Sequence, residues 1–237
     1  MDKLLYLFIT VLCVSCGIPE FVYLEKPLII NKAHSTSEFA VFQNSVDNDP
    51  KYFLGFDVYY KFYNKRSTLK QTVKRLKNCT RNTLVNSYAF SKLYRVEKQD
   101  LSYQGLPGYT FPVKINKTKP FRVMVNLMND QDENNTFETY IGYLIGQDIV
   151  NNKIYLCRYP KQNRIKKNQA NRIARSFAPD NFSINDGDLP QKITGNKIYM
   201  ILYVCSLGYD NNIISLFSDP LYLGEFEFEI KEGVFND

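Results

Sequence analysis

Apolar and polar residues alternate most regularly in residues 51–64, KYFLGFDVYYKFYN. Four apolar or aromatic residues share one face: Phe56, Val58, Tyr60 and Phe62. The intervening positions share the other face: Asp57, Tyr59, Lys61 and Tyr63. A period of two built from β-forming residues predicts a strand, with the first face buried in a core and the second face more exposed.

The hydrophobic period changes in residues 67–78, STLKQTVKRLKN. Three apolar residues fall on one narrow helical stripe: Leu69, Val73 and Leu76. This spacing indicates a helix with a single apolar side. Ser67 or Thr68 is expected to cap its N-terminus, and the basic residues near its end suit the helix dipole. We therefore predict a short helix that lies on a sheet.

Further segments rich in β-forming residues lie between clusters of turn-forming residues, and those near the C-terminus are the clearest. They are residues 37–45, 87–96, 111–116, 121–128, 136–146, 153–160, 198–207, 213–217 and 221–230. Pro220 limits the last of these to a sheet edge or to a strand that starts beside it. The segment 161–180 is predicted to be a basic helix or a loop. The pattern predicts an all-β fold, mainly β with one or two short helices, arranged as a sandwich.

Two stretches indicate a particular kind of sandwich. FLGFDVYYKFY (53–63) resembles the third strand of fibronectin type III and related Ig-like modules. IYMILYVCSLGYDNNIISLFSDPLYLG (198–224) resembles their last two strands. The resemblance implies an Ig-like sandwich split between residues 36–63 and 197–232, and interrupted by a large insertion, 64–196, with its own hairpins and basic helical segments. A single larger, unrelated, mostly-β fold is the alternative.

The N-terminus has the pattern of an export signal. Lys3 precedes an apolar segment, Leu4 to Val14, that is shorter than the roughly 20 residues of a membrane-spanning helix. Ser15, Cys16 and Gly17 follow it. The segment resembles the lipobox of bacterial lipoproteins, in the relaxed form of spirochaete-type sequences. The resemblance implies a signal peptide at 1–15, lipid on Cys16, a lipidated tether at 16–35 and a location in the bacterial envelope, periplasmic or on the outer-membrane surface. A plain secreted protein and a retained N-terminal anchor are the alternatives.

Positive charge is concentrated in two clusters that contain no acidic residue, within a chain of net charge +6. The first cluster is Lys65, Arg66, Lys70, Lys74, Arg75 and Lys77. The second is Lys161, Arg164, Lys166, Lys167, Arg172 and Arg175. The simpler interpretation is that both clusters belong to a solvated face of the protein without a binding role. The functional interpretation is contact with an anionic partner, either anionic lipid or another envelope protein, because an exported chain rarely meets nucleic acid.

Residues that would hold a metal or carry catalysis are sparse. The chain has one histidine, His34, and no CxxC spacing, so neither a Cys/His zinc site nor a His-dependent triad is expected. Residues 130–135 and 185–188 are acidic but are expected to be turns without an ion. Cys205 is expected to be a small buried hydrophobe. A disulfide between Cys79 and Cys157 is one alternative, and two free thiols are the other.

Glutamates alternate with apolar residues in EFEFEI (225–230), which predicts an amphipathic edge strand with a solvated acidic side. We therefore expect no cofactor, no metal and no enzymatic activity, and instead a membrane-anchored protein with a binding or structural role. The alternative is an envelope hydrolase that acts on carbohydrate through carboxylates in the insertion.

Overall fold

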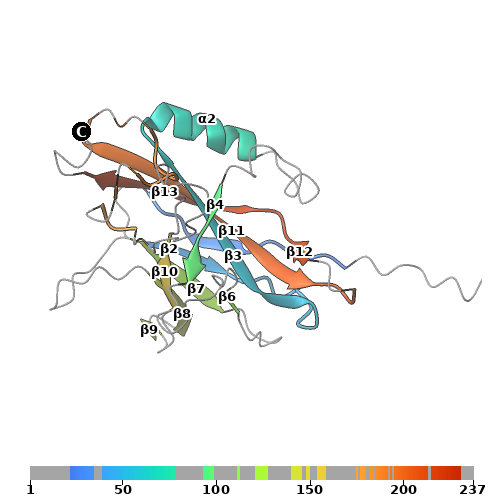
Figure 1. Cartoon of the computed structure of the whole chain (residues 1–237). Coiled ribbons are helices and arrows are strands. Elements are labelled where there is room, and N and C mark those ends of the chain that lie inside the picture. The colour runs from blue at the N-terminus through green and yellow to red at the C-terminus, as the bar shows by residue number, and fades with distance from the viewer. Residues whose placement is uncertain are drawn as a thin grey trace, which may run out of the picture.

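The fold is mainly β, with two antiparallel sheets and, in the described part of the chain, one short helix (Figure 1). It is seen in a computed structural model. The structure describes residues 22–34, 39–77, 93–98, 111–112, 121–127, 140–145, 148–149, 154–158, 175, 177–179, 182–183, 185–191, 193, 195–212 and 215–230. The predicted signal peptide, Cys16 and the acidic turn at 130–135 lie outside these residues. One of the two sheets is curled into a half-barrel.

The first sheet has seven strands. In spatial order they are β1 (Leu28–Asn31), β2 (Phe39–Gln43), β7 (Arg122–Asn126), β8 (Tyr140–Ile145), β10 (Ile154–Cys157) and β5 (Glu97–Lys98), with β9 (Asp148–Ile149) paired to β8. Residues 64–196 supply five of these strands. This segment therefore completes the sheet that β1 and β2 begin.

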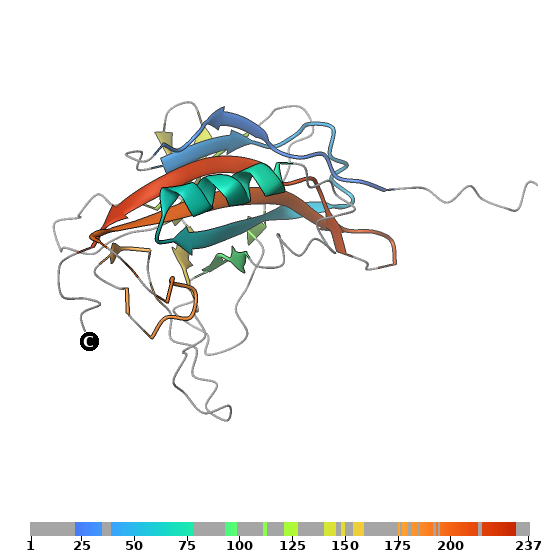
Figure 2. The same cartoon turned by 90° about the horizontal axis from the view of Figure 1, so that it is seen from above.

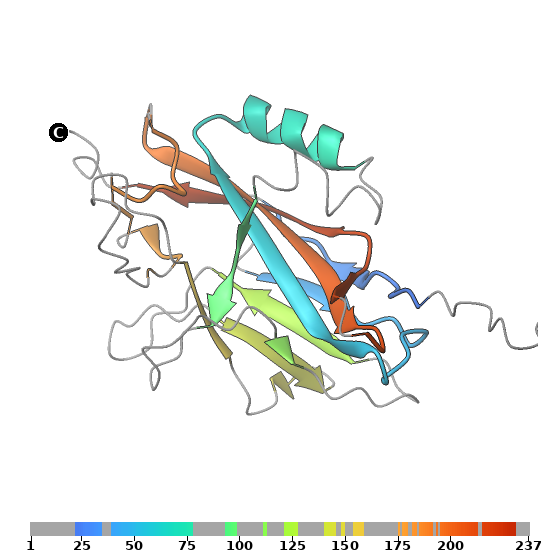
Figure 3. The same ribbon diagram turned by 45° about the vertical axis from the view of Figure 1, so that its right-hand side comes forward.

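The second sheet has six strands, which are β12 (Ser215–Phe217), β11 (Lys197–Tyr209), β3 (Phe53–Tyr63) and β4 (Tyr94–Arg95) in order, with β13 (Leu221–Glu229) beside β11 and β6 (Phe111–Pro112) beside β3. The long strands β3 and β11 run side by side, with the helix on one side of them and β2, β7 and β8 on the other (Figure 3). The predicted C-terminal strands are confirmed, and β13 begins directly after Pro220.

The main core lies between the two sheets and is rich in aromatic rings. Phe42 from β2 meets Phe56 from β3 edge-on, with ring centroids 4.9 Å apart. Phe62 packs against Phe228 from β13, at 6.0 Å between centroids. Residues from 64–196 belong to the same core, among them Val96, Val123, Val125, Leu127, Ile141, Leu156, Phe177, Phe182 and Leu189. The two sheets therefore share one hydrophobic core.

The predicted inward face of β3 is confirmed, because Phe56, Val58, Tyr60 and Phe62 are all buried. The expected exposure of Asp57 is wrong: this side chain is fully buried. The outer face of β3 is covered, and Asp57 is paired there with the guanidinium of Arg95 from β4. It also accepts a hydrogen bond of 3.1 Å from the hydroxyl of Tyr59. Burial raises the pKa of Asp57 above its usual value, and the charge of Arg95 opposes that rise.

The predicted helix is confirmed as α2 (Arg66–Leu76), which lies over β11 and β13 when the molecule is seen from above (Figure 2). Leu69 and Leu76 are buried against the outer face of the second sheet. That face is formed by Tyr63, Ile201, Tyr203 and Cys205. Cys205 is therefore a buried hydrophobe, as expected. The expected cap is wrong, because Lys65 is the N-cap and makes no side-chain capping bond.

The start of the described chain is fastened to the second sheet. The backbone N–H of Glu25 donates to Asn48 Oδ1 at 2.6 Å, and Ser206 Oγ donates to the carbonyl of Glu25 at 2.7 Å. Further on, the backbone of Ala33 crosses β13 at Gly224, where a Cβ would lie 2.2 Å from the Ala33 oxygen. Only glycine allows that approach, so residues 24–33 hold a fixed path along the domain.

Truncation of the inward face of β3 should be costly. We expect Phe62→Ala to lower the free energy of unfolding by about 3–5 kcal/mol, because it leaves a cavity in a packed aromatic core. Leu54→Ala is the matched control on the same strand, since Leu54 is 41% exposed. Its cost should stay within about 0.5 kcal/mol. Denaturant titrations measure both values, and equal losses would contradict the assignment of the buried face.

Candidate functional site

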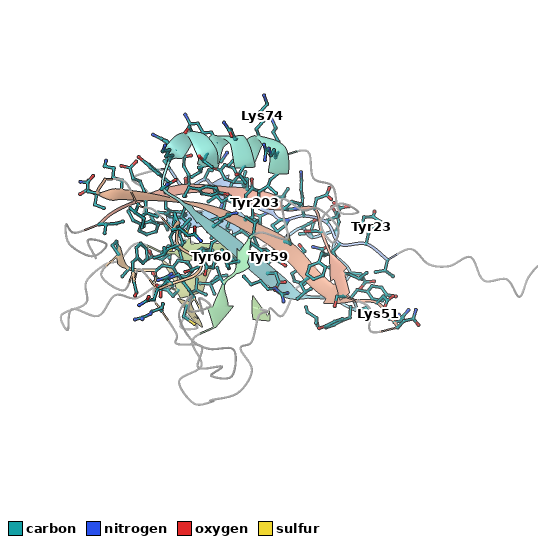
Figure 4. The ribbon with its side chains drawn as sticks, turned by 45° about the horizontal axis from the view of Figure 1, so that its top comes forward. Tyr23, Lys51, Tyr59, Tyr60, Lys74 and Tyr203 are labelled. Atoms are coloured by element: carbon teal, nitrogen blue, oxygen red, sulfur yellow. The ribbon has the colours of Figure 1, made fainter. Side chains whose placement is uncertain are left out.

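The first candidate is the exposed side of α2, called here the helix surface: Lys65, Arg66, Lys70, Lys74, Arg75 and Lys77. Every one of these residues is exposed. Lys74 points away from the sheet (Figure 4). The arrangement follows from the sequence, because burial of Leu69 and Leu76 turns the intervening basic residues towards solvent.

Acidic residues on β13 divide the helix surface into two parts. Glu225 pairs with Arg66 at the start of α2 and raises the pKa of that guanidinium. Further along β13, Glu227 pairs with Lys197. Lys70, Lys74 and Lys77 form no ion pair with any residue in the described ranges. Lys65, the N-cap, forms none in these ranges either, so the uncompensated positive charge lies on Lys65 and along the C-terminal two-thirds of the helix.

The second basic cluster falls mainly outside the described residues, where Lys161, Arg164, Lys166, Lys167 and Arg172 lie. Its last member, Arg175, is described and is half-buried. The backbone of Arg175 pairs with that of Arg158, and its Nε lies 3.6 Å from Asp186 Oδ1.

The second candidate is a buried polar cluster around Arg158, the residue that follows β10. Its guanidinium donates two hydrogen bonds to Asp188, both of 2.9 Å, and one of 3.0 Å to Asp186 Oδ2. The hydroxyl of Tyr60 donates to Asp188 Oδ2 at 2.7 Å. The guanidinium also lies 4.9 Å from the ring centroid of Phe182. Residues from β3, β10 and the segment 182–188 thus meet at one charged group.

The charges in this Arg158 cluster nearly balance. Two carboxylates face Arg158, and Arg175 supplies a second cation beside Asp186. Burial raises the pKa of Asp186 above its usual value, while the charge of Arg158 opposes that rise. Burial, with the charge of Asp188, raises the pKa of Tyr60 well above its usual value. Both carboxylates are buried, so the geometry suits the joining of chain segments and leaves no access for a substrate.

Sequence reasoning missed the Arg158 cluster. The turn predicted at 185–188 exists, and the Asp186 N–H donates to the Ser183 carbonyl at 2.9 Å. Its aspartates are buried and paired with Arg158, a pairing that the prediction of a turn did not include. One signal was available: Arg158 directly follows the apolar strand IYLC, and a charge at the end of a buried strand needs a partner. The sequence does not show which acidic turn supplies that partner.

The other residues considered from the sequence are the glutamates of 225–230 and the cysteines. Glu225, Glu227 and Glu229 share the outer side of β13, as predicted, while Phe226 and Phe228 are buried. Cys157 is buried, and Cys79 lies outside the described residues, so the disulfide is untested. No group of three His, Cys, Asp or Glu side chains in the described residues could hold a metal ion. None of the helices that the structure describes has the length and apolar character needed to cross a membrane.

Comparison of the chain with protein-family models, with curated proteins and with solved structures found no match. The functional argument therefore depends on the residues and their geometry.

Arg158 should be essential to stability. We expect Arg158→Met to lower the free energy of unfolding by about 3–5 kcal/mol, because it leaves two buried carboxylates without their main cation. The triple variant Arg158→Met, Asp186→Asn, Asp188→Asn should recover a large part of this loss, since no buried charge is then left unpaired. Arg175→Met, which changes the partly exposed arginine, is the control and should cost less. A loss in Arg158→Met below that of the control would contradict this account.

The deficit of Arg158→Met should also depend on pH. Without the Arg158 cation, only the partly exposed Arg175 opposes the effect of burial on Asp186, and the pKa of Asp186 rises further above its ordinary value of about 4. A carboxyl group whose pKa is raised by folding stabilises the folded state at a pH below its pKa in the unfolded chain. This stabilisation is lost as the pH rises through its pKa in the folded protein. The deficit should therefore be small below about pH 4 and grow towards neutrality. Denaturant titrations across this range measure it, and a deficit independent of pH would argue against buried carboxylates as the cause.

Proposed function

We propose that this chain is a bacterial envelope lipoprotein, anchored through lipid on Cys16, with a non-enzymatic binding or structural role. The observation that carries the proposal is the apolar segment Leu4–Val14 followed by Ser15, Cys16 and Gly17. Lipidation of such a cysteine adds at least two acyl chains, and two chains give stable membrane binding where one gives only marginal binding. The hydrogen bonds of Glu25 to Asn48 and Ser206 fix where the folded domain begins, so under this proposal the linker from Cys16 to the domain is short.

The helix surface is the part of the domain that we propose contacts an anionic partner. Lys70, Lys74 and Lys77 project from a helix whose other side is fixed on the sheet. Each basic residue near an anionic lipid surface contributes about 1 kcal/mol of attraction. The partner is anionic lipid of the membrane that holds the chain, or another envelope protein with an acidic surface.

The Ig-like interpretation has one supporting observation. β11 lies between β3 and β13 in one antiparallel sheet, which is the neighbour order of the third, sixth and seventh strands of an Ig-like sandwich. These are the strands whose sequences resemble that module. Modules of this kind commonly serve in binding, and the scaffold fits the proposed role.

The state of the carboxylates favours a binding or structural role over carbohydrate hydrolysis. A hydrolase needs two carboxyl groups that can reach a sugar from opposite sides. Asp186 and Asp188 are buried and paired with Arg158, and Glu225 is paired with Arg66. These pairings are typical of structural roles.

The anchor is tested directly by Cys16→Ser. We expect this variant to lose metabolic acyl labelling and to leave the detergent phase for the aqueous phase, because it removes the sulfur that would carry the lipid. Cys13→Ser is the matched control, three residues earlier in the same segment, and should keep both properties. Acyl labelling that survives in Cys16→Ser would refute the lipoprotein proposal.

The helix surface is tested with a form of the chain that begins at residue 17, added to vesicles with and without anionic lipid. Replacement of Lys70, Lys74 and Lys77 by Gln should weaken co-sedimentation with anionic vesicles by about a hundredfold, from three contributions of about 1 kcal/mol each. Binding of the unchanged form should also fall as salt rises, because exposed charges are screened beyond about 8 Å at physiological ionic strength.

An opposite variant makes the vesicle test sharper. Glu225→Gln removes the acid that pairs with Arg66, so it should strengthen binding to anionic vesicles. Equal binding to neutral vesicles, or a change in the same direction for both variants, would show that charge on the helix surface does not attract the membrane.

A further inference from the structure

The outermost strand of the first sheet, β1, is exposed along its whole length. Its three aliphatic residues, Leu28, Ile29 and Ile30, are 50%, 40% and 46% exposed. Among the strands whose side chains the structure describes, β1 is the one in which every residue is exposed. Leu28 and Ile29 point to opposite faces of the sheet, so these residues together with Ile30 form an apolar patch around its outer edge, of the kind that marks a contact surface.

Residues on both sides of β1 extend this patch into what we call the edge strip: Tyr23, Lys26, Leu28, Ile29, Ile30 and Lys32. Tyr23 is 58% exposed, and both lysines are exposed. The ammonium of Lys32 lies 4.3 Å from the ring centroid of Tyr222, so Lys26 is the more available cation. No acidic residue occurs between Lys26 and His34. An aromatic ring, aliphatic side chains and flanking lysines are the combination found at the boundary between headgroups and acyl chains.

The position of the edge strip relative to Cys16 is limited by the chain itself. Leu24 is buried and Glu25 is hydrogen-bonded to Asn48 and Ser206, so the linker from Cys16 ends there. Seven residues separate Cys16 from Leu24, and the chain between these two residues spans at most about 28 Å. A lipid on Cys16 would therefore hold residue 24 within about 28 Å of its attachment point, so the edge strip, which begins beside it, lies within reach of the bilayer.

Pairing with another strand explains the exposed residues less well. β1 contains a bulge between Ile29 and Asn31. Pro27 directly precedes the strand, and Lys32 directly follows it. Bulges, prolines and lysines are the devices that prevent an edge strand from pairing with a further strand. The edge is thus protected against a second copy of the chain, while its side chains stay available to lipid.

We propose that the edge strip is a second membrane contact, which rests in the headgroup layer of an anionic bilayer. Leu28, Ile29 and Ile30 enter the boundary of the acyl region, and Lys26 lies among the anionic headgroups. The inference rests on the proposed lipid anchor and adds to it a defined side of the domain that faces the membrane.

The chain has no tryptophan, so a single introduced tryptophan reports its own surroundings. We would compare Leu28→Trp with Gln191→Trp in the full lipidated chain, reconstituted in vesicles that contain anionic lipid and bromine-labelled acyl chains. Gln191 is exposed and uncharged, and its segment, 185–191, lies across the molecule from β1 (Figure 2). The fluorescence of Leu28→Trp should shift to shorter wavelength and be quenched several-fold more strongly than that of Gln191→Trp. Ile30→Trp is the second variant and should repeat the result.

The outcomes separate the edge strip from the anchor. In acyl-labelled chain, equal quenching at the two sites, or none at Leu28→Trp and Ile30→Trp, would overturn the edge strip while the lipoprotein proposal stands. If the chain carries no acyl label, the lipoprotein proposal fails, and anionic vesicles are added to the unlabelled chain. Quenching of Leu28→Trp there supports the edge strip alone, and its absence overturns it. Cross-links between copies through β1, without quenching, would assign the surface to a second copy and overturn the lipid contact.

Discussion

The double-sided burial of β11 is the constraint on which the rest of the structure depends. This strand pairs with β3 along one edge and with β13 and β12 along the other. Ile198, Met200 and Leu202 face the core between the sheets. Ile201, Tyr203 and Cys205 face the opposite way and would meet water if the sheet stood alone. A strand that is apolar on both faces needs a layer on each side.

The helix α2 supplies the second layer, and its chemistry follows from that task. It covers the outer face of β11 with Leu69 and Leu76, and its remaining positions must then face solvent. The chain places lysine and arginine at several of those positions, so the cover of the sheet is also a basic surface. Packing and charge thus have one origin, because the stripe that buries the helix also fixes the direction of its cations.

Local periodicity was sufficient to predict much of this arrangement. The alternation in 53–63 predicted β3 and its buried face, and the spacing of Leu69, Val73 and Leu76 predicted α2. It was insufficient for Asp57, because the pattern of a strand does not reveal that Arg95 on the neighbouring strand β4 pairs with this carboxylate on the outer side. It also missed the pairing of Arg158 with Asp186 and Asp188, which are 28 and 30 residues away along the chain. Contacts of this kind are set by the three-dimensional path of the chain, and no local period encodes them.

The basic helix surface, the largely apolar edge strip and one acidic row lie close together on the outside of this fold. Ala33, which follows the edge strip, bridges to Gly224 on β13, and the next residue of β13, Glu225, pairs with Arg66 of α2. An unpaired glutamate row would be repelled by an anionic bilayer. The pairs with Arg66 and Lys197 reduce that repulsion, so the row separates the helix surface from the edge strip without opposing either one. Under the proposed lipid anchor, both surfaces are within reach of an anionic membrane, and the balance between them depends on salt, because the helix surface is electrostatic while the edge strip is largely apolar.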